Sequence, residues 1–102
     1  MGNSIYYGVY PKECNNDKVL PYLDVDNICV DLNISKKSQK EFFDILRKYS
    51  FEKIDNDSCY YHCFIITYYE DYFNFCNEVN IVLPEDIKCD DFDNDILIFW
   101  VA

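Results

Sequence analysis

The chain has 102 residues and a formal net charge of -10, and half of its residues are hydrophobic and 19% are aromatic. Acidic segments that stay disordered are poor in apolar and aromatic residues, so this composition predicts a folded protein. A chain of this length holds one hydrophobic core, and we expect a single domain over residues 1–102. A negative surface repels phosphate backbones and anionic lipid. The charge therefore argues against direct binding of nucleic acid or membranes and favours a basic protein partner.

Residues 1–27 predict an N-terminal extension that is less regular than the remaining chain, 28–102. Apolar residues alternate with other residues over 5–9, which predicts a short strand that ends at Pro11. The alternation returns over residues 28–32 and predicts a half-buried strand.

A helix is predicted to follow this strand and to end near Ser50. Ser38 and Glu41 have the spacing of a capping box, and Ser35 is a candidate for an earlier cap. Apolar residues then recur at helical spacing at Phe42, Ile45, Leu46 and Tyr49. Residues 51–54 predict a strand after the helix.

The second half of the chain predicts another helix between strands. Residues 59–69 are rich in aromatic and β-branched residues and predict a long central strand. A helix is expected from Glu70 to Val79, a short strand over residues 81–83, and a final strand over residues 96–101 that is apolar on both faces and so interior to the sheet.

Without the short strand over residues 81–83, the order from residue 28 onward is strand, helix, strand, strand, helix, strand. It predicts an α+β fold in which two helices pack on a single antiparallel or mixed β-sheet, with a βαββαβ-like core. A ferredoxin-like arrangement with an N-terminal extension is one option for that core.

An acidic segment precedes the final strand and is the candidate partner-binding site. Several carboxylates on a short connector can pair with the lysines and arginines of a basic cleft. We expect this surface to contain Glu85, Asp86, Asp90, Asp91, Asp93 and Asp95. A calcium loop is disfavoured, because Ile96 and Ala102 stand where that loop needs glycine and glutamate. The alternative is a solvated loop that keeps the adjacent apolar strand soluble.

The charge is distributed unevenly along the chain. Residues 36–53 contain six of the nine cations and have a local balance of +3, whereas residues 55–95 contain eleven acidic residues and only Lys88 as a cation. Mixed charge on a helix usually serves solubility, through pairs such as Lys40 with Asp44. An RNA-binding helix is the alternative for this segment.

The six cysteines are expected to be reduced and mostly buried. The N-terminal residues lack the features of a secretory signal, and no apolar run is long enough to span a bilayer, so we expect a cytoplasmic protein without a disulfide framework. Cys59, His62 and Cys63 cluster in sequence, but a strand places His62 on the face opposite the two cysteines. We therefore predict no metal site, no cofactor and no catalytic residue.

Three segments resemble the virulence-associated protein D ribonucleases, a family of small ferredoxin-like nucleases. They are Ile28-Cys29-Val30-Asp31-Leu32, the stretch Leu46-Arg47-Lys48-Tyr49-Ser50-Phe51-Glu52-Lys53-Ile54, and Ser58-Cys59-Tyr60. They lie within residues 28–60, so the resemblance extends over about a third of the chain, and it implies a ribonuclease in which Asp31 takes part in cleavage. Ser50 stands where the family usually has glycine.

Small size, acidity, many aromatic residues and the lack of a catalytic set favour a binding protein over an enzyme. The expected function is inhibition of a basic protein partner, foremost as a bacterial immunity protein, or antitoxin, that neutralises a cognate nuclease toxin, as in contact-dependent growth inhibition. A phage anti-CRISPR or other anti-defence inhibitor that mimics nucleic acid is a second possibility, and the small endoribonuclease is a third.

Overall fold

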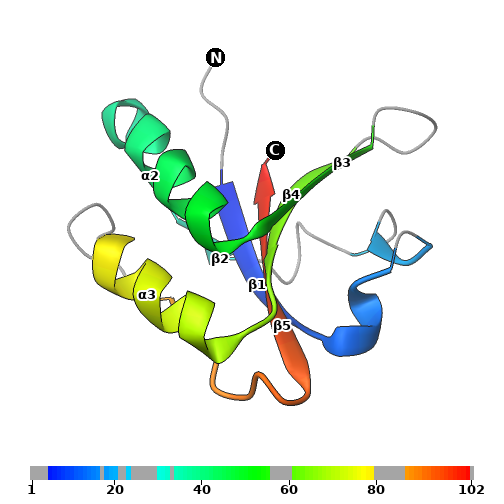
Figure 1. Ribbon diagram of the computed structural model, residues 1–102. Coiled ribbons are helices and arrows are strands. Elements are labelled where there is room, and N and C mark those ends of the chain that lie inside the picture. The colour runs from blue at the N-terminus through cyan, green and yellow to red at the C-terminus, as the bar shows by residue number, and fades with distance from the viewer. Residues whose placement is uncertain are drawn as a thin grey trace.

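The computed structural model describes residues 5–16, 18–20, 23, 30–32, 34–55, 61–79 and 87–101. Two helices pack on one face of an antiparallel β-sheet, and a short 3-10 helix lies on the other side (Figure 1). The elements are β1 (Ile5–Pro11), η1 (Lys12–Cys14), β2 (Val30–Asp31), α2 (Lys36–Tyr49), β3 (Phe51–Asp55), β4 (Tyr61–Ile66), α3 (Tyr69–Val79) and β5 (Asp95–Val101). The α+β prediction is confirmed.

The sheet has the strand order β2-β1-β5-β4-β3, and the described residues of β2 are Val30 and Asp31. β5 lies at its centre, and its residues 96–100 are all buried because β1 and β4 flank it and both sheet faces are covered. The prediction of a final interior strand is therefore confirmed. Among the described strands, β3 pairs with β4 alone and lies at the edge of the sheet.

β1 is the predicted strand of residues 5–9, extended to Pro11. It pairs with β5 along its whole length, from Ile5 opposite Val101 to Pro11 opposite Asp95. The N-terminal segment thus supplies a strand between β5 and β2, and the core is not confined to residues 28–102 as predicted. The alternating pattern showed the strand but could not show its partner.

The helical connections determine how this sheet differs from a ferredoxin-like one. A ferredoxin-like fold is a split βαβ arrangement, in which each helix joins two parallel strands that another strand separates. Here α3 joins β4 to β5, and these two strands are adjacent and antiparallel. The sheet order therefore departs from the ferredoxin-like order, although the order of elements along the chain is the predicted one.

The first helix begins earlier than the capping-box pattern predicts. α2 starts at Lys36, with Ser35 in the extended N-cap conformation, so the capping-box candidate Ser38 is wrong and the alternative cap position, Ser35, is confirmed. Ser38 lies inside the first turn, where its backbone N–H donates to the Ser35 carbonyl at 3.0 Å. The apolar stripe is confirmed, since Phe42, Ile45 and Leu46 are buried against the sheet.

The long strand predicted over residues 59–69 ends earlier, at Ile66. The chain turns at Tyr68, whose carbonyl accepts the backbone N–H of Tyr72 at 3.1 Å, and α3 begins at Tyr69. Glu70 and Asp71 occupy the first turn, where carboxylates are stabilised by the positive end of the helix dipole. Of the strand predicted over residues 28–32, β2 contains Val30 and Asp31, whereas residues 28–29 and the strand predicted over residues 81–83 lie outside the described residues.

Two apolar clusters cover the two faces of the sheet. The larger one packs α2 and α3 onto Phe64, Leu97 and Phe99. The smaller one covers the opposite face, where Leu20, from the segment after η1, packs with Ile98 among others. Because both faces of the sheet are covered, the polar groups that can contact a partner lie at the ends of the sheet and on the helices.

Candidate partner-binding surface

The acidic segment forms a turn that leads into β5, below the first turn of α3 in Figure 1. Asp90, Asp91 and Asp93 are exposed, and Asp95 is half-buried. Asp95 is the first residue of β5 and pairs with Pro11. The structure thus brings four of the six predicted carboxylates to one short segment. Glu85 and Asp86 lie outside the described residues.

Asp91 shapes this turn from within. Its Oδ1 accepts the backbone N–H groups of Asp93 at 3.2 Å and Asn94 at 3.3 Å, and its Oδ2 accepts the Asn94 side-chain amide at 2.9 Å. The hydrogen bond from the Asn94 side chain, foremost, lowers the pKa of the Asp91 carboxyl. The Asp91 carboxylate therefore serves mainly to stabilise the turn. Asp90 and Asp93 are the better candidates for contact with a partner.

Two exposed aromatic side chains of α3, Tyr69 and Phe73, lie beside the acidic turn. Tyr68, Tyr69 and Phe73 are 70%, 60% and 51% exposed. Phe92, in the middle of the turn, packs against Tyr69 with ring centroids 6.3 Å apart, and Tyr69 lies 6.2 Å from Phe73. We call the surface made by Tyr69, Phe73, Asp90, Asp91 and Asp93 the acidic–aromatic surface.

The sequence did not identify the aromatic part of this surface. Tyr68 and Tyr69 were expected in a strand, and Phe73 was not assigned to any face of the helix. A signal was present, because Tyr69 and Phe73 are four residues apart and neither belongs to the apolar stripe of the helix. Two apolar residues at helical spacing that lie outside the buried stripe are expected to form a pair on the surface of the helix.

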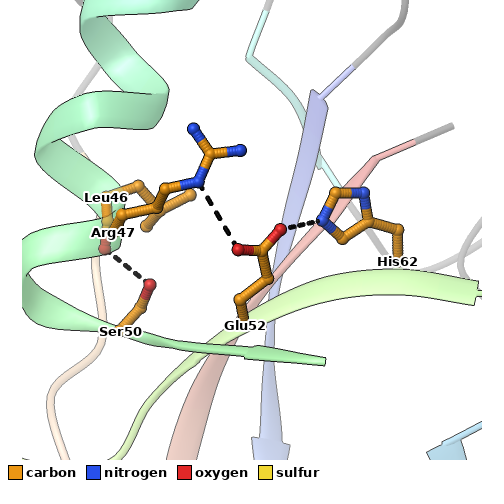
Figure 2. A network of polar contacts seen from close by, with 5 residues as sticks. All are labelled: Leu46, Arg47, Ser50, Glu52 and His62. Atoms are coloured by element: carbon orange, nitrogen blue, oxygen red, sulfur yellow. Dashed lines mark hydrogen bonds and ion pairs between the residues drawn. The ribbon is translucent and has the colours of Figure 1, made fainter. Parts of the chain in front are cut away.

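The structure also forms a polar network on the helical side of the sheet, near the β3 edge (Figure 2). Glu52 on β3 lies between His62 on β4, at 2.6 Å from Nε2, and Arg47 on α2, at 3.4 Å from Nε. The guanidinium carbon of Arg47 also lies 5.7 Å from the Phe43 ring centroid and 5.8 Å from that of Phe64. This arrangement holds the end of α2 against two strands.

Asp31 and His62 cannot form one site. Asp31 lies on β2 and His62 on β4, and β1 and β5 lie between these strands. With neighbouring strands about 4.8 Å apart, the two backbones are separated by about 14 Å. The residue that the ribonuclease resemblance singles out is thus remote from the only histidine in the sequence.

The described cysteines are thiols in apolar surroundings. Cys63 and Cys89 are buried, and Cys14 and Cys76 are half-buried. Burial, foremost, raises the pKa of the Cys89 thiol, which disfavours the reactive thiolate. Cys63 lies in the smaller apolar cluster, on the sheet face opposite His62, as predicted. Cys29 and Cys59 lie outside the described residues.

Two further properties concern the described residues alone. Within them, no three histidine, cysteine or acidic side chains are grouped so that they can hold a metal ion. Neither α2 nor α3 is long and apolar enough to cross a bilayer, and the described part of the chain contains no other helix that is.

Comparisons with known proteins returned no relative. No protein-family model matches the chain, and neither curated proteins nor solved structures gave a match. The functional argument therefore depends on the chemistry of the surface.

Proposed function

We propose that this chain is a protein-binding inhibitor of a basic protein, and specifically a bacterial immunity protein that acts in the cytoplasm on a cognate nuclease toxin. The observation that carries the proposal is the packing of Phe92 against Tyr69. Through this contact, exposed carboxylates and exposed aromatic rings share one surface.

Each part of the acidic–aromatic surface has a role in such a complex. Nucleases hold nucleic acid in a cationic cleft, and carboxylates can occupy the positions of the phosphates and speed association. Exposed tyrosines supply the buried anchors that dominate binding energy in protein interfaces. A solvated loop that only keeps β5 soluble needs the carboxylates but not exposed rings beside them.

The test combines affinity capture with a charge-matched control. The full chain is used to capture partners from its native host, and the bound protein is identified, purified and assayed for nuclease activity. Asp90→Asn with Asp93→Asn removes two exposed carboxylates of the surface. Glu41→Gln with Asp44→Asn removes two exposed carboxylates from α2, away from it.

We expect the chain to inhibit the captured nuclease at equal stoichiometry. The Asp90 and Asp93 double variant should associate about three- to tenfold more slowly at low salt, with a weaker salt dependence, whereas the α2 control should behave like the wild type. Equal association rates for both variants would contradict the proposed surface. A captured partner without nuclease activity would contradict the immunity role.

A phage inhibitor of a host defence nuclease would use the same chemistry, and the genomic neighbourhood separates it from an immunity protein. A gene for a toxic C-terminal domain beside this one favours immunity, and a phage genome favours the inhibitor. The ribonuclease alternative makes a different prediction. If the purified chain degrades RNA and Asp31→Asn abolishes that activity, the inhibitor proposal is wrong.

A further inference from the structure

A hollow of about 170 Å³ lies next to the acidic–aromatic surface, at the end of the sheet where α2 leaves it and α3 begins. Its walls include Ser50, Phe51, Thr67, Tyr68 and Asp71. Phe51, on the edge strand β3, is 73% exposed, and Tyr68, at the start of α3, is 70% exposed. Two aromatic rings that would normally be buried thus flank an open, partly polar cavity.

Asp71 gives this hollow its charge preference. It faces the hollow from the first turn of α3. Among the described residues, no cation pairs with its carboxylate. Lys48 also lines the hollow, but its ammonium lies 3.1 Å from Glu78 Oε2, which offsets its charge. The hydroxyl of Tyr49, which also lines the hollow, is already engaged, because it donates a hydrogen bond to Glu78 Oε1 at 2.5 Å.

The positive end of the α3 dipole opposes a cation at this place, since a helix N-terminus favours anions. Two carboxylates in the first turn, Glu70 and Asp71, more than offset the half charge that this dipole represents. They equally disfavour an anion such as phosphate. The local balance of the hollow is therefore negative.

We propose that this hollow receives an arginine side chain of the basic partner, with the guanidinium against Asp71 and its plane against Tyr68 or Phe51. Arginine fits both features, because its guanidinium pairs with carboxylates and stacks on aromatic faces. The chain already contains such a contact at Arg47, over Phe43 and Phe64. The inference rests on the proposed function, since that function supplies the basic partner.

A neighbouring hollow helps to define the specificity. It shares Thr67 and Tyr68 with the first one, but its other lining residues are Lys12, Asn15 and Ile96. A cation beside Lys12 would be repelled, and none of the described residues that line this second hollow is a carboxylate that could offset it. The arginine is thus assigned to the side of Tyr68 that faces Asp71.

The test does not require the partner. The isotopically labelled full chain is titrated with N-acetyl-arginine amide and, separately, with N-acetyl-citrulline amide, a neutral analogue of nearly the same shape, and amide chemical shifts are followed by NMR. We expect saturable shifts at Ser50, Phe51, Thr67 and Asp71 with the arginine compound. The citrulline compound should cause much smaller ones.

Two variants then separate the ion pair from helix effects. Asp71→Asn should weaken arginine binding about threefold, as is typical of a partly exposed ion pair. Glu70→Gln removes the adjacent first-turn charge, which does not line the hollow, and should change the affinity less. Both variants alter the same turn of α3, so a loss of helix stability alone would affect them alike.

Three results would overturn the arginine site: equal shifts with citrulline, shifts confined to residues 90–95, or unchanged affinity in Asp71→Asn. Any of them would leave the proposed function standing if the Asp90 and Asp93 variant still weakens a captured nuclease complex. Conversely, arginine binding in the hollow without a nuclease partner would retain the site and remove the immunity role.

Discussion

The hydroxyl of Tyr72 donates a hydrogen bond of 2.6 Å to the backbone carbonyl of Ile87. Tyr72 lies on α3, and Ile87 is buried at the start of the segment that leads to the acidic turn. The ring of Tyr72 also packs on Phe92, with centroids 5.2 Å apart. One side chain thus holds both ends of this segment to the helix that carries the exposed aromatic residues.

Removal of this hydroxyl should loosen the acidic turn without unfolding the protein. We expect Tyr72→Phe to lower the free energy of unfolding by about 1 kcal/mol, since the ring contact remains and the hydrogen bond that is lost is only partly buried. Urea denaturation followed by circular dichroism measures this change. Tyr68→Phe, which removes an exposed hydroxyl, is the control and should be neutral. A Tyr72→Phe protein as stable as the wild type would show that the bond does not hold the segment.

The same tyrosine predicts a loss of stability in alkali. Burial, foremost, raises the pKa of Tyr72 from 10.0 to about 12. Folding therefore favours the neutral phenol, and its contribution is complete below pH 10 and lost as the pH rises toward 12. We expect the difference in stability between wild type and Tyr72→Phe to shrink over this interval in urea denaturation. A constant difference from pH 9 to pH 12 would contradict the assignment.

Asp91 predicts the opposite pH dependence, in acid. Hydrogen bonds from Asn94, foremost, lower the pKa of its carboxyl below 3.8, so its contribution is present above that pH and lost as the pH falls through the lowered pKa. We expect Asp91→Ala to lower the thermal midpoint at pH 7 and to differ less from wild type at pH 2. Asp93→Ala, at an exposed position of the same turn, is the control. An equal effect of both substitutions at pH 7 would show that Asp91 does not shape the turn.

Local patterns predicted the elements well because each one depends on short-range chemistry. The stripe of Phe42, Ile45 and Leu46 fits a helix wherever that helix packs, and the continuous apolar run of β5 requires cover on both faces. The pairing of the strands was not predictable from such local patterns. Nothing within residues 5–11 indicates that β1 lies between β5 and β2, because that depends on which apolar surface remains uncovered after the helices pack.

The sequence predicted only part of the candidate surface. The acidic segment was evident from charge alone, but Asp90, Asp91, Asp93 and Asp95 proved unequal, since two of them serve the turn and the start of β5. The aromatic half was not predicted, because tyrosine favours strands and Tyr68 and Tyr69 were therefore assigned to the preceding strand. In the structure Tyr69 begins α3, and two carboxylates in its first turn stabilise the start of this helix. The hollow beside Asp71 needs the edge strand β3, which is distant in sequence.

The network of Arg47, Glu52 and His62 predicts a small effect on stability and none on binding. Its side chains are 51%, 32% and 20% exposed, and ion pairs of this kind contribute less than about 1 kcal/mol because water and salt screen them. We therefore expect Glu52→Gln to destabilise the fold by less than about 1 kcal/mol, with a smaller effect at high salt.

We expect the smaller apolar cluster to tolerate the replacement of Trp100 by phenylalanine. Its indole is 4% exposed, and among the described residues no acceptor lies within hydrogen-bond distance of its Nε1. A buried donor without a partner costs about 1–3 kcal/mol, and Trp100→Phe removes that cost while it leaves a cavity that costs a similar amount. We expect Trp100→Phe to change the free energy of unfolding by less than about 1 kcal/mol, whereas Trp100→Ala should lose about 3–5 kcal/mol, as large core truncations do. Urea denaturation followed by far-ultraviolet circular dichroism measures both variants. If Trp100→Phe costs as much as Trp100→Ala, the packing of the indole against Tyr10, 6.5 Å away between ring centroids, outweighs its unpaired donor.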